Sequence, residues 1–109
     1  MGLFALERIL ELQAEGHPIF PGSVGENLTV VGLAWSGLAP GARLALGGEA
    51  VVEITSYTGP CKNIAGSFAG GDFKRISQKV HPGDSRLYAR VLRPGRLFVG
   101  QSVKFLNVS

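Results

Sequence analysis

The first stretch of the chain carries apolar residues at helical spacing. One side of such a helix would hold Leu3, Leu6, Ile9 and Leu10, and the other Glu7, Arg8, Glu11 and Glu15. Gly16 is well placed to end the helix, and Pro18 cannot continue it. The pattern therefore predicts an amphipathic helix over residues 3–15. Because its polar side is mainly acidic, we expect it to pack on a protein core rather than on a membrane surface.

After Pro21 and Gly22 the pattern changes to short apolar runs broken by glycine and proline. Several runs alternate apolar and polar positions, as strands with one buried face do. The strand candidates are residues 28–33, 43–46, 50–57, 87–92, 96–99 and 103–108. Pro94 and Gly95 predict a hairpin, with proline fixing the first corner and glycine taking a positive φ at the second. Many short, closely spaced strands predict a mostly β fold, as a small barrel or sandwich.

Residues 61–79 interrupt the strand pattern. Within them, 63–68 and 73–79 are candidates for short helices after Cys61. The chain has 109 residues and no internal repeat, which predicts a single domain over 1–109. The expected fold is therefore mostly β and barrel-like, with one amphipathic helix at the start and one or two short helices after Cys61.

Composition narrows the class of partner. Hydrophobic residues make up 45% of the chain and charged residues 17%, which predicts either an unusually buried sheet or a surface that a partner covers. The net charge of +3 suits an anionic ligand and is too weak to establish nucleic-acid binding. A single cysteine excludes an internal disulfide and predicts a reducing, cytoplasmic setting. No apolar run is long enough for a membrane span.

Cys61 is the first candidate for chemistry. It follows a β-branched run and the turn Thr58-Gly59-Pro60, and it precedes Lys62 and a predicted helix start. A helix start and a neighbouring cation both favour the thiolate, which is the reactive form of cysteine. The alternative is a buried, inert cysteine, which is common in protein cores.

A glycine-rich loop and an arginine are further candidates. Gly25, Glu26 and Asn27 lie in a short polar loop ahead of a strand candidate, where backbone N–H groups can approach an anion. The alternative is an ordinary loop with a capping asparagine. Arg90 interrupts a strand pattern, and its planar guanidinium suits a phosphate or a carboxylate unless it simply faces water.

Taken in order, these segments resemble the MOSC domain, named for the C-terminal domain of molybdenum cofactor sulfurases. The similar segments are Pro21-Gly22-x-x-Gly25-Glu26-Asn27-Leu28-Thr29, then Gly59-Pro60-Cys61-Lys62, then Tyr88-Ala89-Arg90-Val91-Leu92-x-Pro94-Gly95 with Val99-Gly100-Gln101-Ser102-Val103. They span roughly three quarters of the chain. Each piece alone is weak, whereas the three in this order are specific.

The resemblance implies a β-barrel-like fold and a role in sulfur or molybdenum-cofactor chemistry. Cys61 would carry sulfur as a persulfide or bind molybdenum as a thiolate. Gly25, Glu26, Asn27, Lys62 and Arg90 would hold the pterin-bound cofactor. We therefore expect the thiol of Cys61 to share one positively biased cavity with the side chains of Asn27 and Arg90.

Members of the family usually carry a further segment before the first helix. Its absence here predicts a pocket that is incomplete, shared between subunits or completed by another chain, and on this basis we expect a homodimer. Expected partners are a sulfur donor such as a cysteine desulfurase, a molybdoenzyme or a redox protein. The chain is too short to hold a pyridoxal phosphate domain.

Two alternatives to sulfur carriage stay open at this point. One is a non-catalytic basic β-barrel that binds single-stranded nucleic acid, although the aromatic residues are scattered and do not alternate with basic ones. The other is a component of a molybdenum-dependent reductase for N-hydroxylated compounds. Whether the chain is an enzyme of sulfur transfer, part of an oxidoreductase or a carrier is not decided by the residues.

Overall fold

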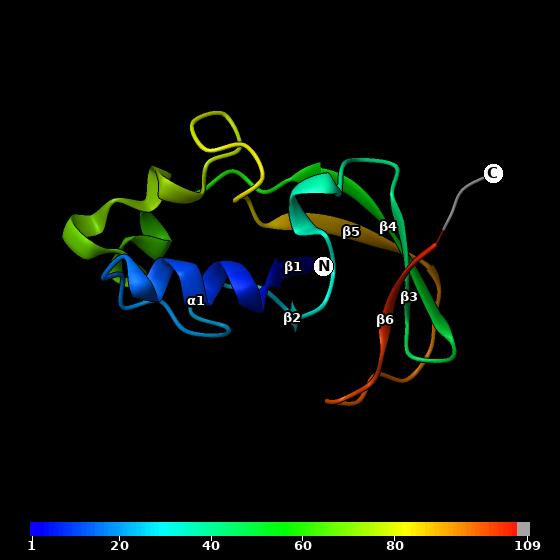
Figure 1. Cartoon of the computed structure of the whole chain (residues 1–109). Coiled ribbons are helices and arrows are strands. Elements are labelled where there is room, and N and C mark those ends of the chain that lie inside the picture. Colours follow the sequence, from blue (N-terminus) through cyan, green and yellow to red (C-terminus); the bar gives the residue numbers. More distant parts are fainter. Residues whose placement is uncertain (107–109) are drawn as a thin grey trace.

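A six-stranded curled sheet forms the body of the protein (Figure 1). The structure is a computed structural model, and it describes residues 1–106. The strand order is β2-β1-β5-β4-β3-β6, so that β2 and β6 are the two edges. The strands are β1 (Gly2–Ala5), β2 (Leu28–Val30), β3 (Arg43–Leu46), β4 (Ala50–Tyr57), β5 (Leu87–Arg93) and β6 (Val103–Leu106). Only the β1–β2 pair is parallel. The mostly β, barrel-like fold expected from the sequence is confirmed, as a half-barrel.

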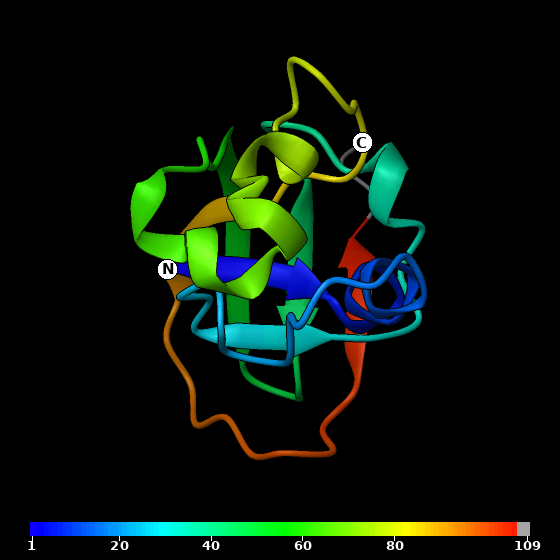
Figure 2. The same ribbon diagram turned by 90° about the vertical axis from the view of Figure 1, so that its left-hand side faces the viewer.

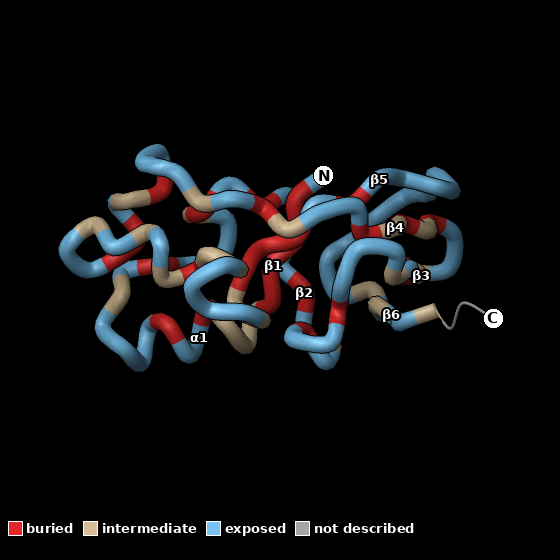
Figure 3. The backbone as a smooth tube through the Cα atoms, turned by 90° about the horizontal axis from the view of Figure 1, so that it is seen from above, coloured by how far each residue is buried: buried red, intermediate tan, exposed pale blue. Residues whose placement is uncertain are grey.

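The start of the chain is a strand rather than the first turn of a helix. All four residues of β1 are buried, and Figure 3 shows this strand as an almost continuous buried segment. It lies between β2 and β5, where Leu3 is opposite Leu28 on one side and Leu87 on the other. A strand covered on both faces is apolar throughout and does not alternate. The helix prediction for residues 3–5 is therefore wrong, because an unbroken apolar run also fits a helical spacing.

The predicted helix is confirmed from Leu6 onwards, as α1 (Leu6–Ala14). Ile9 and Leu12 are its buried residues, whereas Leu10, expected on the buried side, is 54% exposed. Gly16 has a φ of +99°, and the N–H of His17 donates to the carbonyl of Leu12 at 3.1 Å. This bond from the residue after a left-handed glycine ends the helix as expected. Among residues 1–106 no helix is long and apolar enough to cross a membrane.

Two strand predictions match β3 and β4 at both ends, and β2 is shorter than predicted. Residues 96–99 form no strand, so the predicted hairpin at Pro94 and Gly95 is wrong. The chain instead continues as a loop to β6, which pairs with β3. Gly95 is needed for close approach, because a Cβ there would lie 2.6 Å from Cβ of Glu49. Residues 107 and 108 of the last strand candidate lie outside the described residues.

The segment after Cys61 folds into short 3-10 helices. They are η2 (Lys62–Ser67), η3 (Ala69–Gly71) and η4 (Phe73–Ile76), and a further one, η1 (Trp35–Gly37), precedes β3. Ile64, Phe68 and Ile76 bury their side chains in the main core. The expectation of short helices is confirmed, although they are 3-10 rather than α-helical.

Phe4 should be among the most costly positions to truncate. Its side chain is fully buried and meets the ring of Trp35 edge to face, with ring centroids 6.1 Å apart. We expect Phe4→Ala to lower the free energy of unfolding by about 3–5 kcal/mol, because it leaves a cavity in the core. Leu10→Ala, on the exposed side of α1, should change it by less than about 0.5 kcal/mol. Urea unfolding of both variants measures this, and equal losses would contradict the described packing.

An ion-pair network fastens α1 to the segment around η4. Arg75 donates to both carboxylate oxygens of Glu15, at 2.8 and 2.7 Å, and to Asp84 at 2.5 Å. The hydrogen bond from Arg75 holds the pKa of Glu15 below its usual value, and the two carboxylates raise the pKa of Arg75. A carboxyl group with a lowered folded-state pKa stabilises the fold above its unfolded pKa, and this is lost as the pH falls through the folded value.

We therefore expect acid to weaken the fold through this network. The free energy of unfolding of the wild-type chain should decrease from about pH 5 downwards, and this decrease should be shallower in Arg75→Gln, where Glu15 keeps His17 but loses its guanidinium partner. Urea unfolding at a series of pH values measures the slopes. Parallel slopes for the two proteins would show that the pair does not contribute.

Candidate functional site

The only cysteine is free and exposed. It lies between the end of β4 and the start of η2, and its backbone is extended, with φ −141° and ψ 174°. Its carbonyl accepts the N–H of Ile64 at 3.2 Å, which begins the 3-10 turn. The structure therefore places Cys61 at a strand-to-helix junction and shows a thiol that solvent and reactants can reach.

Arg86 is the cation that the fold holds next to the cysteine loop. Only 8% of this residue is exposed. Its Nη1 donates to the carbonyl of Val24 at 2.6 Å, and its Nη2 donates to the carbonyl of Gly59 at 3.4 Å. One guanidinium thus links the glycine-rich loop before β2 to the loop that carries Cys61.

Burial and neighbouring negative groups shift the pKa of Arg86 in opposite directions. Burial lowers the pKa of this guanidinium, because a desolvated cation is less stable, while Tyr88, Cys61 and Glu26 oppose the shift. Arg86 is therefore a largely desolvated cation with the thiol position and the carboxylate of Glu26 among its neighbours. Such a cation favours an anion beside it, whether a thiolate or a bound ligand.

Further hydrogen bonds join the same segments. The N–H of Thr58 donates to the carbonyl of Arg86 at 2.9 Å, and the hydroxyl of Ser85 donates to the carbonyl of Thr58 at 3.3 Å. From η2, the hydroxyl of Ser67 donates to the carbonyl of Ser23 at 3.3 Å. These bonds hold the loops before β2, after β4 and before β5 against one another at one end of the sheet.

Several buried polar atoms of these segments have no hydrogen-bond partner among the described residues. They are Oε1 of Glu26, Oγ1 of Thr58 and Nε of Arg86, and each residue is at most 8% exposed. The other oxygen of Glu26 accepts the hydroxyl of Thr29 at 3.2 Å. Buried polar atoms are nearly always satisfied by protein, water or ligand, so these atoms are suited to bind water or a polar ligand.

Gly25 and Asn27 mainly shape the loop before β2. Gly25 has a φ of +79°, a conformation that favours glycine. Asn27 exchanges two bonds with Gly2: its N–H donates to the carbonyl at 2.8 Å, and its Oδ1 accepts the N–H at 2.7 Å. Asn27 therefore fastens this loop to β1, as the capping alternative would have it, and its role toward a cofactor stays a prediction.

Arg90 points to a different face from the one predicted. Val52 and Ile54 are buried, so Glu53 between them lies on the outer face of the sheet, and Arg90 is its cross-strand partner. Nε and Nη2 of Arg90 contact Oε2 of Glu53 at 2.8 and 2.5 Å, and this lowers the pKa of Glu53. Lys62, in contrast, is exposed directly after Cys61 and has no ion pair in the part of the chain that is described.

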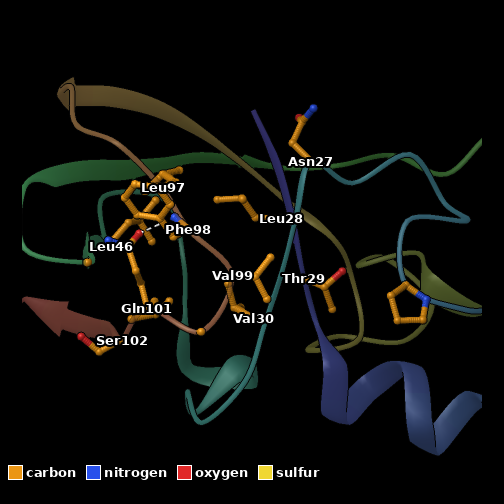
Figure 4. Close-up of a pocket in the computed structure, with 14 residues that line it drawn as sticks. Asn27, Leu28, Thr29, Val30, Leu46, Leu97, Phe98, Val99, Gln101 and Ser102 are labelled. Carbon is orange, nitrogen blue, oxygen red and sulfur yellow. Dashed lines mark hydrogen bonds between the residues drawn. The ribbon is translucent and has the colours of Figure 1, made fainter.

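A cavity of about 500 Å³ opens between the edge strand β2 and residues 97–103 (Figure 4). Asn27 is among its lining residues, whereas Cys61 and Arg90 are not. In Figure 4 the amide of Asn27 points away from the apolar side chains of the cavity. The expectation that Cys61, Asn27 and Arg90 share one cavity is therefore not met here: Arg90 lies beside Glu53 on the outer face of the sheet, and Cys61 lies in the loop between β4 and η2.

Arg86 is the residue that the sequence patterns missed. It stands in a loop, just before β5, and no periodicity or motif marks it. Its partners Val24 and Gly59 are 62 and 27 positions away in the chain. Only the folded structure brings these backbone carbonyls together, so local patterns contain no signal for its burial.

The fold and site define a class: a curled half-barrel with an exposed cysteine in a loop held by a buried arginine. The family model for the MOSC domain matches residues 3–104, and the chain belongs to this family. Membership makes the chain a molybdenum-cofactor-related binding domain.

Solved structures share the fold. YiiM from Geobacillus stearothermophilus superposes with a TM-score of 0.73 at 24% identity, over 96% of this chain and 53% of that one. YiiM from Escherichia coli superposes with a TM-score of 0.73 at 22% identity, over 98% of this chain and 54% of that one. YuaD from Bacillus subtilis superposes with a TM-score of 0.70 at 20% identity, over 94% of this chain and 61% of that one. The chain thus spans about half to three fifths of their lengths, and at these identities the likeness shows the fold alone. No curated protein matches the chain.

Proposed function

We propose that this domain is a sulfur carrier or a molybdenum-cofactor-binding domain that uses Cys61. The observation that carries the proposal is the exposed, free thiol of Cys61 on a loop whose backbone is held by the buried guanidinium of Arg86. Sulfur carriage and molybdenum ligation both require a cysteine that reactants can reach and that can ionise. An inert core cysteine would meet neither condition.

The residues around Cys61 suit an anionic, metal-containing cofactor. Cys61 would supply a thiolate to molybdenum, and Lys62 and Arg86 would balance negative charge on the cofactor. The unpaired Oε1 of Glu26 and Nε of Arg86 offer one acceptor and one donor to a polar heterocycle. When bound, the cofactor supplies a redox-active metal, while the chain binds, orients and partly shields it.

In the sulfur-carrier branch, Cys61 accepts sulfur from a persulfide on a donor such as a cysteine desulfurase. The thiolate of Cys61 attacks the outer sulfur of the donor's persulfide and forms a new S–S bond. The donor's S–S bond breaks, and its electron pair leaves on the donor's thiolate. The proton of the persulfide stays with the transferred sulfur, so no external oxidant or reductant is needed.

A cation near the sulfur supports this step in one specific way. Attack requires the thiolate, and both the attacking and the leaving sulfur carry negative charge. Lys62 follows Cys61 directly in the chain, and the guanidinium of Arg86 donates to the carbonyl of Gly59, two residues before Cys61. We expect them to stabilise this charge while the exposed position of the thiol lets the donor approach.

Molybdenum content tests the cofactor branch. Wild-type protein made in a host that synthesises the cofactor should retain molybdenum in elemental analysis, and Cys61→Ser should lose it. Lys104→Gln, an exposed substitution on β6, is the matched control and should retain the metal. If the wild type and Cys61→Ser hold equal amounts, Cys61 is not a molybdenum ligand.

A further inference from the structure

His17, which follows α1, is a mostly buried histidine that takes no part in the candidate site. Its side chain is only 10% exposed. Its ring meets the ring of Phe68 edge to face, with ring centroids 5.4 Å apart, and Phe68 is buried in the main core. Figure 2 shows the short helices after Cys61 in front of the sheet, beside the chain that leaves α1. His17 therefore lies where the end of α1 meets these helices.

One nitrogen of the His17 ring accepts a hydrogen bond from the backbone. The N–H of Ala69 donates to Nδ1 at 3.0 Å. A backbone N–H can only donate, so Nδ1 must offer its lone pair and carries no proton. The neutral ring then carries its proton on Nε2. The hydrogen bond to Ala69 thus exists only while the ring of His17 is neutral.

Glu15 faces the other nitrogen of the ring. Its Oε1 lies 3.6 Å from Nε2 of His17, and no other carboxylate among residues 1–106 lies within ion-pair distance of this ring. Arg75, from η4, donates to both oxygens of Glu15 and also pairs with Asp84. The hydrogen bond from Arg75 holds the pKa of Glu15 below its usual value, so this carboxylate is ionised at the pH at which imidazole groups take up a proton. Glu15 therefore favours the charged ring and holds it at the end of α1.

A proton on Nδ1 removes the hydrogen bond on the opposite side of the ring. Nδ1 becomes a donor and faces the N–H of Ala69, which is also a donor. Ala69 is exposed, so water can accept its N–H once the two groups separate. Gly70 and Gly71 follow, and glycine gives this stretch the backbone freedom to move. Because the charged ring stays beside Glu15, we expect the segment with Ala69 to move.

Two side-chain hydrogen bonds join residues 61–71 to residues 15–23 in the described part of the chain. One is the bond from Ala69 to His17, and the other runs from the hydroxyl of Ser67 to the carbonyl of Ser23 at 3.3 Å. The second bond contains no group that titrates near neutral pH. Loss of the first would therefore leave the segment that begins at Cys61 with one of its two side-chain links to this part of the chain.

We propose that His17 is a pH-sensitive latch, in which proton uptake by the ring breaks the hydrogen bond to Ala69 and releases η3 from the end of α1. The neutral ring holds η3 in place. The charged ring stays with Glu15 and leaves the segment after Cys61 attached by Ser67. This latch does not depend on what Cys61 carries, so its test is independent of sulfur and molybdenum.

NMR of the full, ¹⁵N-labelled chain tests the latch. At about pH 8 we expect Nδ1 of His17 to carry no proton, and at about pH 5.5 both ring nitrogens to carry one. Over this range the amide of Ala69 should exchange about tenfold faster, after correction for the intrinsic pH dependence of exchange, because one hydrogen bond is lost. The amide of Ile54, which donates to Ala42 within the sheet, should stay within about twofold.

Two variants of His17 separate its acceptor from its titration. Asparagine places an oxygen where histidine has Nδ1 and does not titrate in this range, so His17→Asn should protect the amide of Ala69 equally at both pH values. His17→Phe keeps a ring without an acceptor, and this amide should exchange fast at both. His81→Asn, at the other histidine, which is exposed, is the matched control and should behave like the wild type.

Three results would overturn the latch. The first is a proton on Nδ1 of His17 at about pH 8, which would exclude the bond from Ala69. The second is an exchange rate of Ala69 that, after the same correction, does not change with pH in the wild type. The third is a pH dependence of this rate that persists in His17→Asn or His17→Phe, because its origin would then lie in another group.

Discussion

The Cys61→Ser variant is expected to fold like the wild-type chain and to accept no sulfur. Cys61 is the only cysteine, so no other residue can replace it as the persulfide carrier. Because the side chain is exposed, losing the thiol should change the free energy of unfolding by less than about 0.5 kcal/mol. Incubation with a cysteine desulfurase and free cysteine, followed by intact-mass spectrometry, measures the sulfur taken up.

Lys62→Gln provides the comparison for this experiment. It retains the thiol and removes the adjacent cation, so the protein should still accept sulfur, but more slowly. A Cys61→Ser protein that gains as much reductant-labile sulfur as the wild type would refute the assigned role. Equal rates of sulfur uptake for Lys62→Gln and wild type would show that Lys62 does not contribute, and would leave the role of Cys61 unchanged.

Replacing Arg86 with methionine is expected to cost about 2–4 kcal/mol of the free energy of unfolding. The substitution keeps an apolar chain of similar length but leaves the carbonyls of Val24 and Gly59 without their donor. Glu26 also loses its buried cationic neighbour. Unsatisfied buried acceptors retain their desolvation penalty, which is why the expected cost exceeds that of a lost surface contact.

Arg90→Met is the matched control for Arg86→Met. Arg90 also belongs to the candidate residues, but its side chain is 63% exposed and its partner is Glu53 on the outer face. Exposed ion pairs typically contribute less than about 1 kcal/mol. Urea unfolding should therefore separate the two variants clearly. Arg86→Met and Arg90→Met proteins of equal stability would contradict the linking role given to Arg86.

The fold follows from the sequence where each strand has one buried and one exposed face. In β4, Val52 and Ile54 are buried while Glu53 and Thr55 are not, and this alternation marks the strand. Leu3 and Phe4 carry no such signal, because β1 is covered on both faces. Pro94 and Gly95 look like a hairpin corner locally, but packing of Gly95 against the turn before β4 determines the path there. Tertiary contact, absent from a local pattern, decides both cases.

In the candidate site, too, local sequence features identify some residues, whereas tertiary contacts determine the others. Cys61 was identifiable because a lone cysteine follows a turn between a strand and a helix start, and these are local features. The cation near Cys61 was not identifiable in this way. Arg90 was the candidate, but the face of the sheet on which it lies depends on its pairing with Glu53. Arg86 becomes important only when loops distant in sequence meet. Sequence similarity located the loops, whereas the structure determined which side chain connects them.

The central claim is that the thiol of Cys61 is the working group of this domain. The most direct measurement takes wild-type protein from cells that make both a cysteine desulfurase and the molybdenum cofactor, and divides one sample between peptide mass spectrometry and metal analysis. Either the peptide containing Cys61 should carry a reductant-labile sulfur, or the protein should hold molybdenum that Cys61→Ser loses. An unmodified Cys61 peptide in a sample without bound molybdenum would contradict it.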